Sequence, residues 1–162
     1  MRFASRLEAM IARLDAQRRH IDAAAAAVAA VPGPVLEIGL GKGRTYDHLR
    51  RRFPDREIVV FDGSVHAPAD AAPPAGSLVL GDFRETLPAV VGTLAPAALI
   101  HADIGSDDRI TDAALATAIA PALARLLAPG GLLIGDRPMP AADLVRVPAP
   151  ETAWPYYRYR LG

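Results

Sequence analysis

The chain has 162 residues, enough for one domain of ordinary size with a core of its own. Apolar residues make up 51% and charged residues 22%, which excludes a largely disordered chain. Eighteen basic and 18 acidic residues give a net charge of zero, which argues against a nucleic-acid partner because nucleic-acid-binding proteins carry excess Lys and Arg. The chain has no cysteine, which excludes disulfide bridges, thiolate metal ligands and a cysteine nucleophile.

Neither a membrane span nor a signal peptide is indicated. The longest apolar run, residues 23–31, is mostly alanine and well short of the ~20 residues that cross a bilayer. The first residues, MRFASRLEAM, do not combine a basic segment with an apolar stretch, as a signal peptide does. We therefore expect a cytoplasmic protein without a membrane partner.

The first predicted element is a long helix over residues 5–30. Apolar residues from Leu7 to Ile21 recur mostly at spacings of three and four, which is typical of a helix with one packed face. Ser5 followed by Glu8 has the spacing of a capping box, and Pro32-Gly33-Pro34 ends the helix.

Short apolar runs then alternate with helical segments. Strands are predicted at residues 35–38, 57–62, 77–80, 97–102 and 132–135. Helices are predicted at 44–53, 83–91 and 111–128, and a proline-rich loop at 63–76. This alternation favours a doubly wound, Rossmann-like α/β fold with a mostly parallel sheet.

We expect one domain over residues 1–162. It divides into the N-terminal helix within residues 1–31, a core at 35–136 and a C-terminal segment at 137–162. Residues 144–147 and 156–160 of that last segment are candidates for further strands, of which one could be antiparallel.

Acidic residues stand at the end of each of the five predicted core strands. They are Glu37, Asp62, Asp82, Asp103 and Asp136. In a doubly wound sheet, ligands bind beyond the carboxyl ends of the strands, where the strand order reverses. These acids therefore predict a ligand site at that edge.

A glycine-rich turn follows the first predicted strand, where residues 37–43 read EIGLGKG. Glycines allow positive φ and let a ligand approach the backbone. A dinucleotide fingerprint, G-x-G-x-x-G, needs a third glycine where Arg44 stands. The spacing E-x-G-x-G-x-G instead resembles the first motif of the class I S-adenosylmethionine (SAM) methyltransferases.

Three later segments also resemble this family, in the right order. Asp62 lies 23 residues after Gly39, where the family has an acid that binds the ribose hydroxyls. Gly81-Asp82-Phe83 resembles the adenine-binding segment, and residues 126–134 resemble the L-x-P-G-G-x pattern before the fifth strand. The resemblance covers roughly residues 35–136 and implies SAM as cofactor and methyl transfer as the activity.

The resemblance also implies individual roles. Its cofactor-binding residues here are Glu37, Gly39, Gly41, Gly43, Asp62, Asp82, Phe83 and Asp103. Glu37 would order the glycine loop and face the cofactor's ammonium group, Asp62 would bind the ribose, and Asp82 with Phe83 the adenine. Other readings stay open, since Asp62 could be a turn residue and Asp82 a helix N-cap. Lys42 is either solvated or close to the cofactor's carboxylate.

The fourth predicted strand ends in His101-Ala102-Asp103, near the expected position of the methyl group. Asp103 and His101 are the candidate catalytic residues, although Asp103 could be a turn residue and His101 a buried core histidine. The N/D-P-P-Y/F motif of amino-directed family members is absent here, which argues against a base or exocyclic nitrogen as acceptor. We expect another small-molecule acceptor, whose identity the sequence does not determine.

Three alternatives compete with this interpretation. A divalent-metal-dependent O-methyltransferase would use Asp103 and Asp136, but Arg137 replaces its Asn, so we expect no metal site. A SAM-binding module without catalysis is suggested by the loop at 63–76, which replaces a crossover helix. An NAD-dependent oxidoreductase is disfavoured by Arg44.

Aromatic residues are concentrated near the C-terminus, where Trp154, Tyr156, Tyr157 and Tyr159 lie within six positions. Strand alternation would direct Tyr157 and Tyr159 to the sheet and Tyr156 to the opposite face. We expect Tyr156 and Trp154 to be exposed to an acceptor or a second subunit. A domain with few covering elements gains most from contact with a second subunit, because that contact buries exposed apolar surface. This predicts a homodimer.

Overall fold

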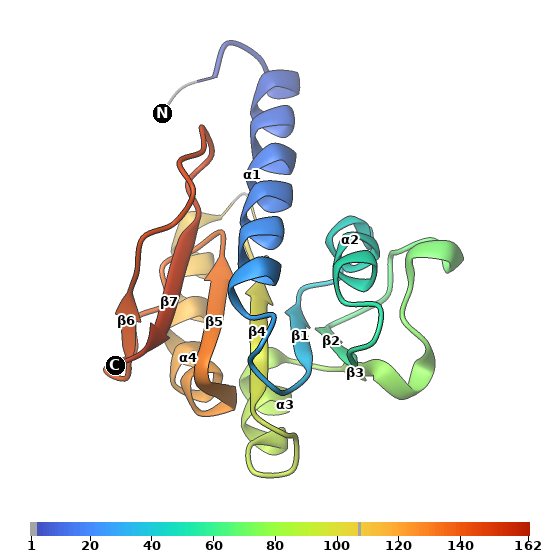
Figure 1. Cartoon of the computed structure of the whole chain (residues 1–162). Helices are drawn as coiled ribbons and strands as arrows, with labels where there is room; N and C mark the ends of the chain where they lie inside the picture. Colours follow the sequence, from blue (N-terminus) through green and yellow to red (C-terminus); the bar gives the residue numbers. More distant parts are fainter. Residues whose placement is uncertain (1–2, 107) are drawn as a thin grey trace.

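The computed structural model describes residues 3–106 and 108–162, whose strands form one mixed sheet (Figure 1). Its spatial order is β3-β2-β1-β4-β5-β7-β6. The strands are β1 Val35–Ile38, β2 Ile58–Asp62, β3 Leu78–Leu80, β4 Ala97–Ala102, β5 Leu127–Gly135, β6 Leu144–Arg146 and β7 Tyr157–Leu161. Strands β1 to β5 are parallel, whereas β7 runs antiparallel to both of its neighbours. The predicted α/β fold with an antiparallel C-terminal addition is confirmed.

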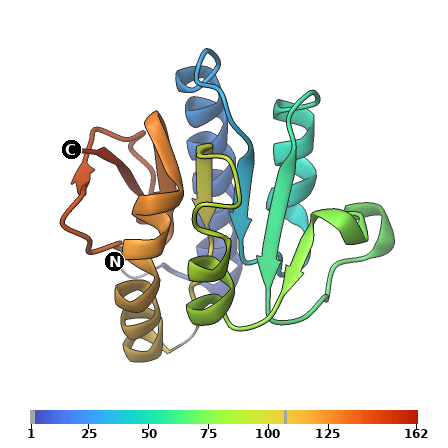
Figure 2. The same ribbon diagram turned by 90° about the horizontal axis from the view of Figure 1, so that it is seen from below.

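Helices cover both faces of the sheet. They are α1 Arg6–Ala27, α2 Arg44–Arg52, α3 Phe83–Val90 and α4 Arg109–Leu126, with the short 3-10 helices η1 Ala69–Ala71 and η2 Ala75–Ser77. Figure 2 shows α1 and α2 on one face and α3 and α4 on the other. None of the helices in the described residues is long and apolar enough to cross a membrane.

Local sequence signals set most element ends where we predicted them. The Ser5 side chain caps α1 by accepting a hydrogen bond from the Glu8 backbone N–H at 3.1 Å. Strand β5 begins at Leu127, earlier than predicted, because the chain pairs with β4 before the turn residues. The register shifts between Ala97 and Leu99, which accommodates the Pro-Gly-Gly segment within the strand.

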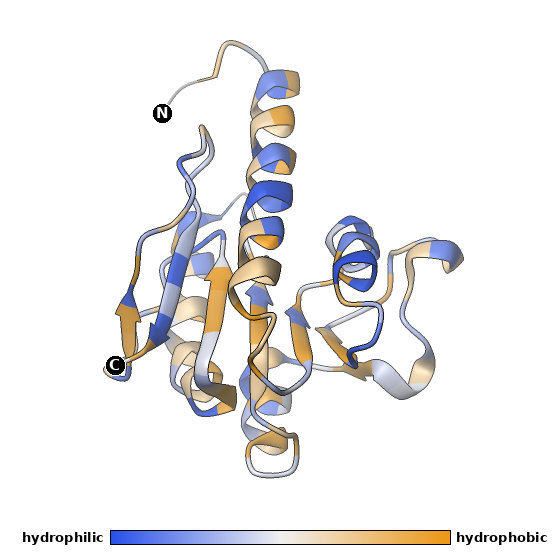
Figure 3. Ribbon diagram, in the orientation of Figure 1, coloured by the Kyte–Doolittle hydropathy of each residue, from blue (hydrophilic) through white to orange (hydrophobic). Residues whose placement is uncertain are grey.

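The core lies in two layers, one on each side of the sheet. Successive strand residues point to opposite faces, so Leu36 and Ile38 contact the α3 and α4 side while Val35 packs on the α1 and α2 side. Strands β4 and β5 are apolar over most of their length, as expected for strands buried on both faces (Figure 3).

The strand order reverses between β1 and β4. Strands β1, β2 and β3 follow one another in one direction, whereas β4 and β5 extend in the other. In sheets of this kind, ligands bind beyond the carboxyl ends of the strands at the point where the order reverses. This edge of the sheet is where the predicted ligand site belongs.

Candidate active site

The glycine loop after β1 provides an open stretch of backbone. Gly39, Gly41 and Gly43 have φ of 95°, 51° and 74°. A Cβ at Gly39 would collide with the carbonyl oxygen of Asp103, and one at Gly43 with that of Ala71. A Cβ at Gly41 would meet no atom within 4 Å. Two glycines thus allow close packing, while Gly41 leaves the exposed backbone that a nucleotide-like cofactor needs.

Asp62, at the end of β2, holds this loop in place. Its Oδ2 accepts hydrogen bonds from the backbone N–H groups of Leu40 at 2.7 Å and Gly41 at 3.2 Å. Its Oδ1 accepts from the N–H of Ser64 at 3.2 Å. The half-buried carboxylate therefore lies directly beside the open backbone of Gly41.

Asp82, after β3, is the N-cap of α3. Its Oδ1 accepts from the N–H of Arg84 at 2.8 Å, and its Oδ2 pairs with the Arg84 guanidinium at 3.1 Å. The capping role that the sequence left open is therefore present. Phe83 packs its ring partly against the core. Asp82 itself is exposed at the same edge of the sheet as Asp62.

A chain of buried polar side chains runs beneath the loop. The Glu37 carboxylate accepts from the Thr45 hydroxyl through Oε1 and contacts His101 Nδ1 through Oε2 at 2.5 Å. His101 Nε2 lies 2.5 Å from the hydroxyl of Tyr156. Glu37 and His101 are fully buried, and Tyr156 is 6% exposed.

The pKa directions agree with this arrangement. Burial lowers the pKa of His101, but the Glu37 carboxylate outweighs it and raises the pKa above its ordinary value. Burial and the carboxylates of Asp103 and Asp136 raise the pKa of Tyr156 well above 10. The phenol thus keeps its proton, and the imidazole remains paired with Glu37.

Two acids stand at the ends of β4 and β5, and helix α1 covers one of them. Asp103 accepts from Arg13 Nη2 at 2.7 Å and from Gln17 Nε2 at 2.6 Å. Asp136 accepts from the N–H of Ile104 at 3.2 Å and pairs with the Arg137 guanidinium at 3.1 Å. Burial and the neighbouring Asp103 raise the pKa of Asp136 to about 6.

Comparison with known proteins assigns the chain to a family. The model of the S-adenosyl-L-methionine methyltransferase family matches residues 4–161, almost the whole chain. The chain belongs to this family. It is therefore a SAM-dependent methyltransferase, and SAM is its methyl donor.

Solved structures agree with this assignment. An S-adenosyl-L-methionine methyltransferase from Silicibacter pomeroyi DSS-3 is 40% identical over 99% of this chain and 100% of its own, with a TM-score of 0.92. TrmN from Thermus thermophilus is 18% identical over 86% of this chain and 46% of its own, with a TM-score of 0.61. CalS11, a TDP-rhamnose 3'-O-methyltransferase, is 21% identical over 82% and 65%, with a TM-score of 0.54. The last two show the fold alone. None of the curated proteins compared matches the chain.

In this methyltransferase, an arginine stands where the metal-dependent enzymes would place a ligand. The Arg137 guanidinium contacts Asp136 and, at 2.7 Å, Asp112, so a cation of the protein itself neutralises these acids. Over residues 3–106 and 108–162, no group of three or more His, Cys, Asp or Glu side chains could hold a metal ion.

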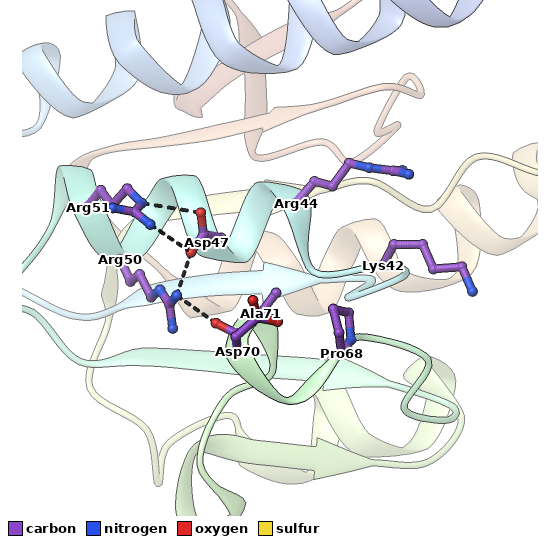
Figure 4. Close-up of a pocket in the computed structure, with 8 residues that line it drawn as sticks. All are labelled: Lys42, Arg44, Asp47, Arg50, Arg51, Pro68, Asp70 and Ala71. Atoms are coloured by element: carbon purple, nitrogen blue, oxygen red, sulfur yellow. Dashed lines mark hydrogen bonds and ion pairs between the residues drawn. The ribbon is translucent and has the colours of Figure 1, made fainter.

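A surface pocket of about 680 Å³ lies between α2 and η1 and borders the glycine loop at Lys42 (Figure 4). Its Arg50 and Arg51 pair with Asp47, and Arg50 also donates to the backbone carbonyl of Asp70 at 2.7 Å. Lys42 extends away from these pairs in Figure 4. Arg50 and Arg51 thus serve contacts within the chain.

The prediction that Tyr156 is exposed is wrong. Tyr156 is buried, and its ring lies 4.7 Å from that of His20 on α1. Trp154 is half-buried and stacks on Phe3 at 5.8 Å. Helix α1 covers Tyr156, which directly precedes β7. Alternation within one strand could not reveal this cover.

Sequence reasoning also missed three residues that hold the site together. Arg13 and Gln17 reach Asp103 from α1, and Thr45 reaches Glu37 from the first turn of α2. The helical pattern places Arg13 and Gln17 four residues apart on one face, but nothing in it identifies their partner.

Proposed function

We propose that this enzyme binds SAM across the carboxyl ends of β1, β2 and β3 and methylates a small molecule near the end of β4. The observation that carries the proposal is the open backbone at Gly41, located where the strand order reverses. Asp62 lies beside this backbone as the ribose acceptor, and Asp82 with Phe83 lies one strand further, where an adenine would reach. Glu37 supports the loop from below.

The residues of the chain act mainly by alignment. Bound SAM supplies a methyl group on a sulfonium, which the acceptor's nucleophile attacks in line. Holding two reactants in register can lower a barrier by several kcal/mol. Gly39 packs against the backbone of Asp103, so the cofactor loop and the end of β4 are in direct contact. This contact fixes the distance between the two halves of the site.

Asp103 is the residue that we propose to face the acceptor. Its side chain is 13% exposed because Arg13 and Gln17 hydrogen-bond to it from α1. Asp103 would serve as a base only if the nucleophile arrives protonated. His101 has both ring nitrogens engaged and no exposed surface, so we assign it a supporting role.

The cofactor placement is tested by titrating the protein with S-adenosylhomocysteine. Asp62→Ala should weaken binding by about 1–3 kcal/mol, because it removes the ribose acceptor and frees two loop N–H groups. The control is Asp55→Ala, which should bind like the wild type. Asp55 is an exposed carboxylate that precedes β2 at the opposite edge of the sheet. Equal affinities for both variants would place the ribose elsewhere.

The acceptor class is tested with SAM that carries a labelled methyl group. The enzyme is incubated with a cell extract separated into dialysable and retained fractions. Label transferred to a dialysable compound, and absent with Asp62→Ala, supports a small-molecule acceptor. Label in protein or nucleic acid contradicts it.

We also propose a two-fold homodimer, formed by α1 rather than by the C-terminal aromatics. Leu7, Met10 and Ile11 are 69%, 47% and 58% exposed and form one apolar stripe on the N-terminal half of α1. At about 100° per residue, Arg6 and Glu8 border this stripe on opposite flanks. A parallel two-fold pairing of α1 therefore brings Arg6 of one copy to Glu8 of the other.

A further inference from the structure

We propose that Tyr156 and His101 are positioning residues for the cofactor, because they hold the Glu37 carboxylate that closes the glycine loop. The inference rests on the proposed cofactor site and extends it to the C-terminal segment. Tyr156 directly precedes β7, so its hydroxyl would link that segment to the loop on which SAM rests.

Glu37 connects the two ends of the glycine loop. It lies two residues before Gly39, and Thr45, whose hydroxyl donates to it, lies two residues after Gly43. The contact therefore joins β1 to the first turn of α2 across the loop. With Asp62 holding the loop's middle, movement of the Glu37 carboxylate would shift both ends of the cofactor-binding backbone.

His101 fixes the second oxygen of Glu37. The two residues are register partners on the neighbouring parallel strands β1 and β4, so the sheet itself brings their side chains together. Both are fully buried, and a buried carboxylate is costly unless it is paired and hydrogen-bonded. Rotation of the imidazole would leave Glu37 held by Thr45 alone.

Tyr156 fixes the orientation of His101. With Nδ1–H donating to Glu37, the other ring nitrogen contacts only the Tyr156 hydroxyl, at 2.5 Å. The two rings are nearly parallel, 16° apart with centroids separated by 6.0 Å, and the His20 ring lies 4.7 Å from the phenol ring. Without the hydroxyl, a buried ring nitrogen has no partner, and the imidazole can turn away.

The test compares two buried tyrosines of one segment. Tyr156→Phe should weaken binding of S-adenosylhomocysteine about three- to tenfold, measured by calorimetry. Tyr159→Phe is the matched control, because Tyr159 is 7% exposed and its hydroxyl accepts from the Met139 N–H at 3.2 Å, away from His101. Tyr159→Phe should bind within twofold of the wild type, even where both variants melt at similarly lowered temperatures.

A second pair of variants separates positioning from simple packing. His101→Asn keeps an N–H near the Nδ1 position, which donates to Glu37. His101→Gln instead places its N–H near the Nε2 position and loses the hydrogen bond to Glu37. We expect His101→Asn to retain more affinity than His101→Gln, with circular dichroism confirming that both fold. In turnover, Tyr156→Phe should raise KM for SAM while kcat at saturating SAM stays close to that of the wild type.

The inference and the cofactor placement fail in different ways. If Asp62→Ala weakens S-adenosylhomocysteine binding but Tyr156→Phe and Tyr159→Phe bind equally, the positioning role is wrong and the site stands. The same holds if His101→Gln binds as well as His101→Asn. If Asp62→Ala binds like the wild type, the cofactor placement itself is wrong.

Discussion

Single carboxylates in this enzyme are set to different tasks by their surroundings. Asp62 sits in a half-exposed position among backbone N–H donors, whereas Asp136 is 2% exposed and lies near a second acid. Asp136 has a pKa raised to about 6, while the half-buried Asp22, held by His48 and Arg52, has a lowered pKa. Burial and the sign of the nearest charge decide the direction in each case.

Asp136 predicts a specific pH dependence of stability. Because its pKa rises on folding from 3.8 to about 6, its stabilising contribution is complete below pH 3.8 and is lost as the pH rises through 6. Asp136→Asn does not titrate, so its free energy of unfolding should rise relative to the wild type by about 2 kcal/mol between pH 4 and 7. Urea unfolding of both proteins across this range measures the difference.

The comparison with a variant is needed because His20 acts in the opposite direction. Burial lowers the pKa of His20 from 6.5 to about 4, so its contribution is complete above pH 6.5 and is lost as the pH falls. The two effects oppose each other in the wild type, but His20 cancels in the difference. Parallel stability curves for the wild type and Asp136→Asn would contradict the raised pKa of Asp136.

At the scale of elements, the glycine loop and the end of β4 are held by two segments from outside the central strands, namely helix α1 and the residues before β7. Asp103 is held by α1, and Glu37 is held through His101 by the residue before β7. Helix α1 and the C-terminal segment thus reach the carboxyl edge of the central strands from both ends of the chain (Figure 1). The loop's shape depends on these elements as well as on its glycines.

The glycines of the loop should respond differently to an added methyl group. Gly43→Ala forces a Cβ against the Ala71 carbonyl at φ of 74°, and should cost about 2–3 kcal/mol of stability. Gly41→Ala meets open space at φ of 51°, and should cost about 1 kcal/mol. Thermal unfolding measures both losses.

The effects on cofactor binding should not follow the effects on stability. Gly41→Ala, the less destabilising of the two variants, should weaken cofactor binding strongly. The Cβ of Gly41→Ala would occupy the space that we assign to the cofactor, and should weaken S-adenosylhomocysteine about tenfold or more. A Gly41→Ala protein that is folded and binds as tightly as the wild type would show that the cofactor does not pass over this backbone.

At the scale of the whole molecule, the exposed stripe on α1 predicts the assembly. Ile11→Asp places a charge in the centre of the stripe and should convert a dimer into a monomer in light scattering at micromolar concentration. Ile110→Asp is the matched control, because Ile110 is 84% exposed at the start of α4 and lies outside the stripe. A monomeric wild type would contradict the dimer. The apolar stripe of α1 would then be available for contact with the methyl acceptor.

The sequence by itself determined the elements and the chemistry at their ends. Helical spacing, the Ser5 cap and the apolar runs of β1, β2 and β4 are local patterns, and they suffice because a helix turn or a strand depends on neighbouring residues. The motif E-x-G-x-G-x-G and the acids after the strands indicated a SAM methyltransferase, which the family match confirms.

Only the tertiary structure decided what surrounds those acids. Arg13 lies 90 positions from Asp103, and Tyr156 lies 55 from His101, so no periodicity connects them. Their contacts depend on the strand order, on the register of β1 with β4 and on which face α1 covers. The burial of Tyr156 follows from that cover, because the side chain's surroundings come from helix α1, which is distant in the sequence.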